Sequence, residues 1–218
     1  ADGGPWRQLR ETLFPGGSMG NGAAMRAAPV GLVFCDDLDR VAEEAARSAR
    51  PTHTHPLGID GARLVALATA LALRGGAFGR AAFFGELQRR ASTEEFRWQL
   101  SAAAGLSPDD PVIGFGNTVV AHRSVVTAIA CFAASPDDYR DVIRRAIGLG
   151  NDVDTIAAMA GAISGARLGL PAIPFHLIHC LEDGPKGRSY LLALGKRLYD
   201  AYLRERPSTQ HQGPAPNT

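Results

Sequence analysis

Apolar residues recur every three or four positions along most of the chain, a spacing that places them on one face of an α-helix. Strand patterns, in which apolar and polar residues alternate, are almost absent. The periodic segments predict helices over residues 38–47, 57–73, 80–90, 94–103, 136–147, 156–168 and 188–206. The sequence therefore predicts an all-α globular domain.

Two further segments are apolar without a clear polar face. Residues 23–34 read as a buried helix that Pro29 would interrupt. Residues 118–133 are apolar around the whole helical circumference, which is typical of a central buried helix. In the last helix, the stripe Leu191, Leu194, Leu198 and Tyr202 is predicted to face one side.

The composition bounds the class of protein. A chain of 218 residues with 45% hydrophobic residues can bury one sizeable core, so a single domain is the default. The net charge of +1 and the scattered basic residues do not indicate nucleic acid or an anionic membrane as a partner. No segment reaches the roughly 18 unbroken apolar residues of a membrane span. Residues 207–218 are polar and proline-rich, and they predict a disordered tail.

The three cysteines are far apart and odd in number. Cys35 and Cys131 lie in apolar runs, which is typical of buried free thiols in a reducing compartment. We therefore expect a cytoplasmic protein.

A pair of carboxylates precedes the helix predicted over residues 156–168. In the stretch GNDVDT, Asp152 and Asp154 lie one residue apart, and Thr155 adds a hydroxyl. Hard divalent cations such as Mg²⁺ prefer such oxygen ligands. The same pattern also caps a helix N-terminus, and taken locally the cap is the more common explanation. One helix needs one cap, however, so the second aspartate favours a metal site.

The helix that follows this pair carries a stripe of small residues. Ala157, Gly161, Gly165 and Gly169 recur every four positions. Such a stripe lets a neighbouring backbone approach closely, which would hold the carboxylate turn rigidly against the core.

A second feature is the glycine-rich loop GGSMGNGAAMR, residues 16–26. Its backbone N–H groups could form a concave anion-binding nest, and a helix starting near Ala23 would direct its N-terminal dipole into the same space. Glycine-rich loops are also common as plain turns, so the loop alone is a weak signal.

A third feature, PTHTHPLG, places His53 and His55 just before the helix predicted over residues 57–73. A histidine here could donate a hydrogen bond to an anion, bind a metal or cap the helix. Zinc is disfavoured because no cysteine or third histidine lies at a ligand spacing. One of the two could be an ordinary surface histidine.

Taken in order, GSMGNGAAMR, THTHPLGIDGA, HRSVVTAIACF and GNDVDTIAAMAGAISGARLG resemble the ADP-ribosylglycohydrolase family. The similarity is nearest to the branch that acts on ADP-ribosylserine and O-acetyl-ADP-ribose, and it runs over residues 16–206. It implies an orthogonal multi-helix bundle with two Mg²⁺ or Mn²⁺ ions at the base of an ADP-ribose cleft. It also implies hydrolysis of the bond to the anomeric carbon of the distal ribose.

The resemblance assigns roles to particular residues. Asp152, Asp154 and Thr155 match the C-terminal half of the metal ligands. His53 matches a histidine that faces the diphosphate. The loop that wraps the diphosphate is matched by Gly17, Ser18, Met19, Gly20 and Asn21.

This sequence departs from the family pattern in two ways. Asn151 and Val153 replace a glycine and a threonine of the usual G-G-D-T-D-T motif, and Asn151 is expected to strain the turn. The N-terminal G-D-x-x-G helix, the T-D-D-T-like segment and the catalytic glutamate have no counterpart, since Asp36-Asp37 follows the glycine loop. Residues 1–206 thus correspond to the C-terminal two-thirds of the family domain, and a separate N-terminal segment or self-association would cover the exposed apolar faces.

The resemblance leaves three functions open. The first is a hydrolase that releases ADP-ribose from a modified protein or a small ester. The second is an ADP-ribose-binding module without productive metals, an alternative that the missing glutamate keeps open. The third is a structural relative that binds neither ligand. The sequence does not select the acceptor, which could be serine, arginine, an acetyl ester or a nucleic-acid end.

Overall fold

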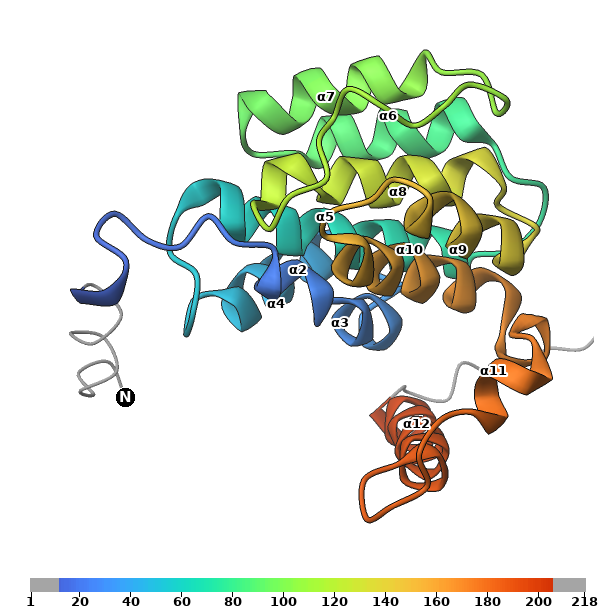
Figure 1. Ribbon diagram of the computed structural model, residues 1–218. Helices are drawn as coiled ribbons and strands as arrows, with labels where there is room; N and C mark the ends of the chain where they lie inside the picture. Colours follow the sequence, from blue (N-terminus) through green and yellow to red (C-terminus); the bar gives the residue numbers. More distant parts are fainter. Residues whose placement is uncertain (1–11, 206–218) are drawn as a thin grey trace, which may run out of the picture. The chain divides into compact units, whose positions relative to one another are not determined.

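The computed structural model describes residues 12–205, and it divides into two compact units, residues 1–174 and 175–218. The helices of the first unit are α2 (Gly22–Met25), α3 (Ala28–Val33), α4 (Leu38–Ala49), α5 (Pro56–Leu73), α6 (Arg80–Arg90), α7 (Glu94–Ala104), η1 (Ala121–Arg123), α8 (Val125–Ala134), α9 (Tyr139–Ile147), α10 (Val153–Leu168) and η2 (Leu170–Ala172) (Figure 1). Within residues 12–205 the β-type pairing is limited to one isolated bridge, between Gly20 and Val120. The predicted all-α class is confirmed.

The second unit contains α11 (Phe175–His179) and α12 (Arg188–Glu205). The carboxylate of Asp183 fixes the start of α12, because it accepts hydrogen bonds from the backbone N–H of Ser189 at 2.7 Å and from Arg188 at 2.9 Å. In the predicted stripe of α12, Leu191 and Leu194 are exposed. The predicted tail, residues 207–218, lies outside the described residues.

Most predicted helices are found within one to three residues of their predicted bounds. The helix over residues 80–90 is confirmed at both ends, and α4 begins after an aspartate, as its pattern indicates. Asp37 caps α4, since its side chain accepts the N–H groups of Asp39 and Arg40. Helix α9 starts at Tyr139, three residues later than predicted, because Asp138 is its N-cap.

The prediction for residues 23–34 is wrong about the position of the interruption. Two helices occupy this segment, and the break between them falls at residues 26–27. Pro29 lies in the first turn of α3. The missing N–H of proline has no intrahelical partner in that position anyway, so Pro29 starts a helix here.

The prediction of one helix over residues 118–133 is wrong at its start. Helix α8 begins only at Val125, after the short η1 turn. The backbone of residues 119–121 pairs instead with the glycine loop: Asn21 N donates to Val119 O and Ala121 N donates to Met19 O, both at 2.8 Å. These tertiary hydrogen bonds prevail over the helical propensity of an apolar segment.

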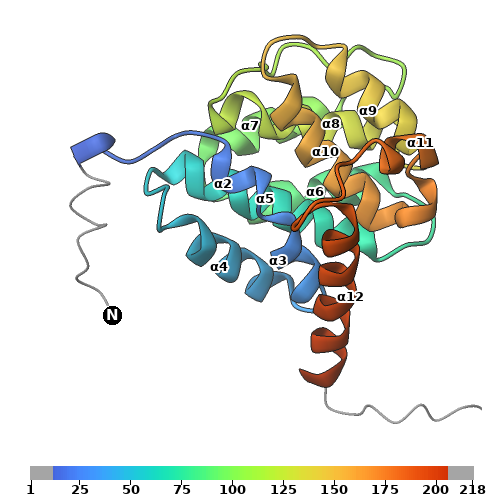
Figure 2. The same ribbon diagram turned by 60° about the horizontal axis from the view of Figure 1, so that its bottom comes forward.

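The core of the first unit is built around α5 and α8. Both views show α5 among the other helices, with α3 and α4 on one side and α8 on the other (Figures 1 and 2). Nine residues in a row on α8, Val125 to Ala133, are buried. By length and composition alone α5 could cross a membrane, but 72% of it is buried inside the fold. Its position in the core accounts for its apolar character.

The small-residue stripe of α10 does not contact a neighbouring backbone, so that prediction is wrong. A Cβ atom at Gly161 would lie 3.0 Å from Ile143 Cδ1 and 3.3 Å from Tyr139 Oη, which are side-chain atoms of α9. At Gly165 nothing lies within 4 Å of such an atom. The stripe therefore makes room for the α9 side chains at one position only.

A buried carboxylate on α5 fastens the start of α7. The Asp60 side chain is fully buried and accepts hydrogen bonds from the backbone N–H groups of Ser92 and Thr93 at 2.9 and 2.8 Å. Arg63 donates to it at 3.2 Å. Asp60 thus anchors the two residues that directly precede α7, whose N-cap residue Thr93 makes no side-chain cap of its own.

We predict that Asp60→Ala lowers the free energy of unfolding by about 3–5 kcal/mol, since it leaves Arg63 and the backbone N–H groups of Ser92 and Thr93 without their buried acceptor. Urea denaturation followed by circular dichroism measures the change. The control is Asp39→Ala, which breaks an ion pair with Arg90 at a carboxylate that is 88% exposed and should cost less than about 1 kcal/mol. Equal losses in the two variants would contradict the proposed anchoring role of Asp60.

Candidate functional site

The glycine-rich loop and the carboxylate turn meet at one side-chain amide. The Nδ2 atom of Asn21 lies 2.7 Å from Asp152 Oδ2, 3.2 Å from Thr155 Oγ1 and 3.0 Å from Ser124 Oγ. Asn21 and Ser124 are buried, so these contacts are shielded from water. The amide therefore joins the glycine loop to the start of α8 and to the start of α10, which both lie more than 100 residues further along the chain.

Asp152 occupies the N-cap position of α10, yet its side chain makes no capping hydrogen bond. Its carboxylate instead accepts hydrogen bonds from Asn21 Nδ2 and from the Thr155 hydroxyl. The explanation of Asp152 as a simple helix cap is therefore wrong. The preceding residue, Asn151, has a φ of 63°, so the strain expected from replacing glycine there is present.

Asp154 lies in the first turn of α10 and is exposed. Within residues 12–205 its carboxylate makes no hydrogen bond or ion pair. Thr155, one residue on, is buried. The two predicted metal-binding carboxylates thus differ, since one is held by neighbours and the other is open to solvent.

Asn117 holds the carboxylate turn, a role that the sequence patterns do not reveal. Its carbonyl accepts the N–H of Asp152 at 3.1 Å, and its Nδ2 donates to Leu149 O at 2.9 Å and Gly150 O at 3.2 Å. Ser124 was missed in the same way. Both residues act through contacts that are distant in sequence, and the only local signal was the polar character of the two side chains within an apolar run.

The glycine loop packs tightly against the segment that carries the histidines. Gly17 has a φ of 90°, and a Cβ atom there would lie 2.3 Å from the backbone nitrogen of His55. Only glycine fits such a position. The N–H groups of Gly17, Gly20 and Asn21 are used within the protein, by Phe14 O, Ser18 Oγ and Val119 O respectively.

In the described structure the N–H groups of Ser18 and Met19 have no such partner, and Met19 is 43% exposed. Among residues 17–21 the open N–H groups are therefore those of Ser18 and Met19. Helix α2 is only four residues long, so the predicted contribution of its dipole is limited to a single turn.

His53 is buried beside the loop. Its Nδ1 lies 2.8 Å from Thr52 Oγ1, and its Nε2 would lie 3.3 Å from a Cβ atom at Gly20. Burial and the nearby Arg26 guanidinium lower the pKa of His53, so the ring is neutral at pH 7. Because Arg26 donates to Thr52 Oγ1 at 2.6 Å, the threonine hydroxyl can donate to Nδ1, which favours a proton on the Nε2 that faces the loop.

His55 acts as a helix cap. Its Nδ1 accepts the N–H of Leu57 at 3.2 Å, and it is the N-cap of α5. Of the alternatives for the two histidines, the structure assigns the cap to His55 and brings His53 to the glycine loop. Among residues 12–205 no group of three or more histidine, cysteine, aspartate or glutamate side chains is placed to hold a metal.

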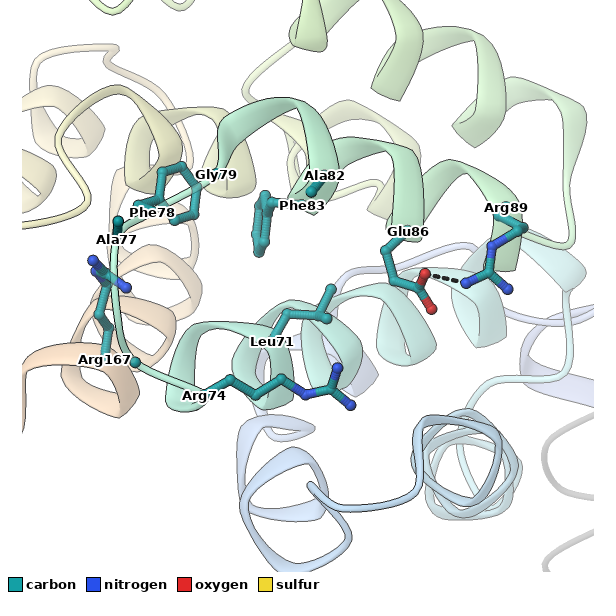
Figure 3. A pocket seen from close by; sticks show the side chains of 11 residues that line it. Leu71, Arg74, Ala77, Phe78, Gly79, Ala82, Phe83, Glu86, Arg89 and Arg167 are labelled. Atoms are coloured by element: carbon teal, nitrogen blue, oxygen red, sulfur yellow. Dashed lines mark hydrogen bonds and ion pairs between the residues drawn. The ribbon is translucent and has the colours of Figure 1, made fainter.

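A separate cavity of about 550 Å³ involves none of the predicted site residues. Leu71 and Phe83 line its apolar part, Arg167 reaches it from α10, and Glu86 and Arg89 face each other on α6 (Figure 3). Glu86 pairs with Arg89, and Arg167 pairs with Asp137, so most of its charges are already neutralised. No residue of the carboxylate turn lines this cavity.

The comparisons with known proteins agree with the geometry. The model of the ADP-ribosylglycohydrolase family matches residues 2–208. The chain belongs to the ADP-ribosylglycohydrolase family. It is 31% identical to ADP-ribosylhydrolase ARH3 of Danio rerio over 97% of this chain, and 34% identical to ADP-ribosylhydrolase ARH3 of Homo sapiens over 72% of this chain.

A solved structure titled "ADP-ribosylglycohydrolase-related protein complex" has the same family fold. The two structures superpose with a TM-score of 0.71 at 26% sequence identity. The match covers 90% of this chain and 66% of the chain in the solved structure. The chain spans 65% and 52% of the lengths of the Danio rerio and Homo sapiens relatives.

We predict an energetic coupling between Asn21 and Asp152. In a double-mutant cycle with Asn21→Ala and Asp152→Ala, the coupling should be about 1.5–3 kcal/mol, the range for a hydrogen bond to a charged group. Urea denaturation of the four proteins measures it. The control cycle pairs Asn21→Ala with Asp109→Ala, an exposed aspartate, and should give a value near zero. A negligible coupling between Asn21 and Asp152 would contradict the bridge.

We also predict that acid weakens the fold partly through His53. The unfolded chain binds a proton on this residue near its ordinary pKa of 6.5, whereas the folded protein resists protonation because its pKa is lowered. The free energy of unfolding should therefore fall as the pH falls from 7 to 5, and His53→Gln should make this fall smaller. The exposed His176, changed to Gln, is the control. An unchanged slope in His53→Gln would refute the assignment.

Proposed function

We propose that this protein binds ADP-ribose and hydrolyses ADP-ribosyl linkages. The observation that carries the proposal is the Asn21 amide, which ties the diphosphate-type loop directly to Asp152 and Thr155. A ligand with a diphosphate at the loop would thereby have its adjoining ribose close to the carboxylates. Family membership and the similarity to the two ADP-ribosylhydrolases support the same function.

The loop residues supply anion recognition. Among residues 17–21 the N–H groups of Ser18 and Met19 are not used within the described structure, and Nε2 of His53 faces the same loop. A neutral donor suits this position, because a diphosphate brings its own charge and the ring is not protonated at pH 7. Arg26 stands behind His53 through Thr52 and adds positive potential near the loop.

The carboxylate turn fits a divalent cation by its chemistry. Asp152, Asp154 and Thr155 offer only oxygen atoms, the type of ligand that Mg²⁺ and Mn²⁺ take. The Asp154 carboxylate has no competing partner among the described residues, while Asn21 and Thr155 orient the carboxylate of Asp152. A bound ion would supply Lewis-acid stabilisation of the ribose hydroxyls and of an attacking water.

The reaction itself breaks the bond between the anomeric carbon of the distal ribose and its substituent. An oxocarbenium-like transition state of this kind needs a carboxyl group for proton transfer. The resemblance assigns that role to a glutamate with no counterpart in this sequence. The part that residues 12–205 play is therefore to bind and orient the ligand. Cys131 and Cys180, which form no disulfide in the described structure, support a cytoplasmic location.

The second candidate is an ADP-ribose-binding module without catalysis. The specific observation in its favour is that the described residues place no group of three metal-ligating side chains together. Such a module would keep the loop, His53 and the Asn21 bridge, and it would bind ADP-ribose with an affinity that does not depend on Mg²⁺.

Isothermal titration calorimetry with ADP-ribose, with and without Mg²⁺, separates these functions. We predict that Mg²⁺ tightens binding and that Asp152→Ala and Asp154→Ala each remove this tightening, a loss of about tenfold or more in affinity. Asp109→Ala, at an exposed aspartate away from the turn, should behave like the unchanged protein. Equal affinities with and without Mg²⁺ would favour the binding module, and no affinity for ADP-ribose would exclude both.

Hydrolysis is tested on an ADP-ribosylserine peptide with the complete protein, with Mg²⁺ or with EDTA. We predict release of ADP-ribose only when the metal is present, because the carboxylates at the turn can act on the ribose only through a bound cation. Full activity in EDTA would refute the metal-dependent mechanism.

A further inference from the structure

A cleft of about 640 Å³ opens at the first turns of α7. It is called the α7 cleft below. It is lined by Glu94, Glu95, Trp98, Gln99, Gly114, Phe115, His122 and Arg123. None of these residues belongs to the diphosphate loop or the carboxylate turn, so the proposed function leaves the cleft unexplained.

Two polar atoms in the wall of the α7 cleft are buried without a hydrogen-bond partner, Gln99 Oε1 and His122 Nδ1. The Gln99 residue is only 8% exposed, although it is polar. A buried acceptor that lacks a donor costs about 1–3 kcal/mol, so folded proteins rarely keep one without a reason. A donor that reaches Gln99 Oε1 from the cleft would satisfy this acceptor.

The α7 side of the cleft is acidic and aromatic. Glu94 and Glu95 precede Trp98 by four and three positions and therefore lie on the same helical face as the indole. Within residues 12–205 neither glutamate makes an ion pair or a hydrogen bond. Trp98 is 69% exposed, which is unusual for so large an apolar side chain.

Residues on the opposite side of the cleft do not neutralise the negative charge of Glu94 and Glu95. Arg123 is exposed and contributes one positive charge against the two glutamates. Burial and Arg123 lower the pKa of His122, with Glu95 acting in the opposite direction, so its ring adds no positive charge at pH 7. The lining thus combines two unpaired carboxylates, two unsatisfied polar atoms and an open indole face.

The α7 cleft adjoins the candidate site through one shared segment. Ala121 N donates to Met19 O of the glycine loop, and the next two residues, His122 and Arg123, line the cleft. Ser124, which follows them, contacts the Asn21 amide, which in turn contacts Asp152. The α7 cleft and the candidate site therefore share the chain segment of residues 121–124.

We propose that the α7 cleft binds a lysine or arginine side chain of the polypeptide that carries the ADP-ribose. This rests on the proposed function, since it names the part of the substrate beyond the ribose. An ammonium or guanidinium group supplies donors for Gln99 Oε1, charge for Glu94 and Glu95, and a cation for the face of Trp98. A nucleic-acid acceptor fits less well, because its phosphates would meet the two glutamates.

The first test compares two ADP-ribosylserine peptides that differ at the residue before the serine, lysine in one and norleucine in the other. Titration calorimetry of each peptide and of free ADP-ribose gives three affinities. We expect the lysine peptide to bind about fivefold or more tightly than the norleucine peptide, as a partly desolvated cation–π and ion-pair contact allows. The preference should weaken as the salt concentration rises.

Variants of the cleft residues test whether the preference for the lysine peptide arises in the α7 cleft. Glu94→Gln combined with Glu95→Gln should reduce it to less than about twofold, because the charge partners of the lysine are lost. Gln99→Leu keeps the size of the side chain and removes the unpaired oxygen, and it should also weaken the preference. Glu43→Gln, at an exposed glutamate on α4, should leave the preference unchanged.

A second measurement tests cation binding in the α7 cleft without ADP-ribose, through the fluorescence of Trp98. The chain has two tryptophans, Trp6 and Trp98, so Trp6→Phe leaves Trp98 as the single indole emitter. Titration with an unmodified lysine-rich peptide should change its emission, while the Glu94→Gln, Glu95→Gln double variant should respond less.

The outcomes separate the two proposals. A protein that binds free ADP-ribose but does not distinguish the peptides overturns only the cleft assignment, and so does tighter binding of an ADP-ribosylated oligonucleotide than of the lysine peptide. A protein that does not bind free ADP-ribose overturns the proposed function, and the Trp98 titration then decides the cleft by itself. No change in Trp98 emission would refute cation binding in the cleft.

Discussion

The hydrogen bonds of the Asn21 side chain are the interaction on which the candidate site depends. One amide nitrogen contacts Asp152, Thr155 and Ser124, and it is buried together with Ser124. The backbone on either side of it is held by the pairing of residues 19–21 with residues 119–121. Without this pairing, the glycine loop would have no fixed relation to α10. The glycine loop and the carboxylate turn are therefore one structural unit.

The same segment has a second consequence. Residues 119–121 form hydrogen bonds with the loop, and this is why the apolar run that contains them is not helical until Val125. The 3₁₀ turn that results directs His122 and Arg123 into the wall of the α7 cleft. On the other wall, the buried carboxylate of Asp60 fixes the start of α7 and with it Glu94 and Glu95. Core contacts thus position both walls of the cleft.

Local sequence patterns predicted the long helices well, because α4, α6 and α10 follow from apolar spacing, and α4 also from the cap Asp37 that precedes it. The local patterns failed where a residue that is distant in the sequence determines where a helix begins. Residues 119–121 form hydrogen bonds with the glycine loop, so α8 begins only at Val125. The residues before α7 are anchored by Asp60, more than 30 residues earlier in the sequence. The resemblance named Asn21 for the diphosphate, whereas its side chain contacts the carboxylate turn. Asn117 and Ser124 could not be predicted, since their partners are set only by the tertiary fold.

Asp152 shows how function can be separated from a common structural role. An aspartate at the N-cap of a helix normally accepts an N–H of the first turn, and that bond stabilises the helix. Asp152 occupies the position but gives up the bond, and Asn151 before it adopts a positive φ. Both features lower the stability of this turn. Such a cost persists where the surrounding contacts enforce it, and here Asn117, Asn21 and Thr155 enforce the orientation of a carboxylate toward the loop. A turn selected for stability alone would instead keep glycine at 151 and a capping side chain at 152.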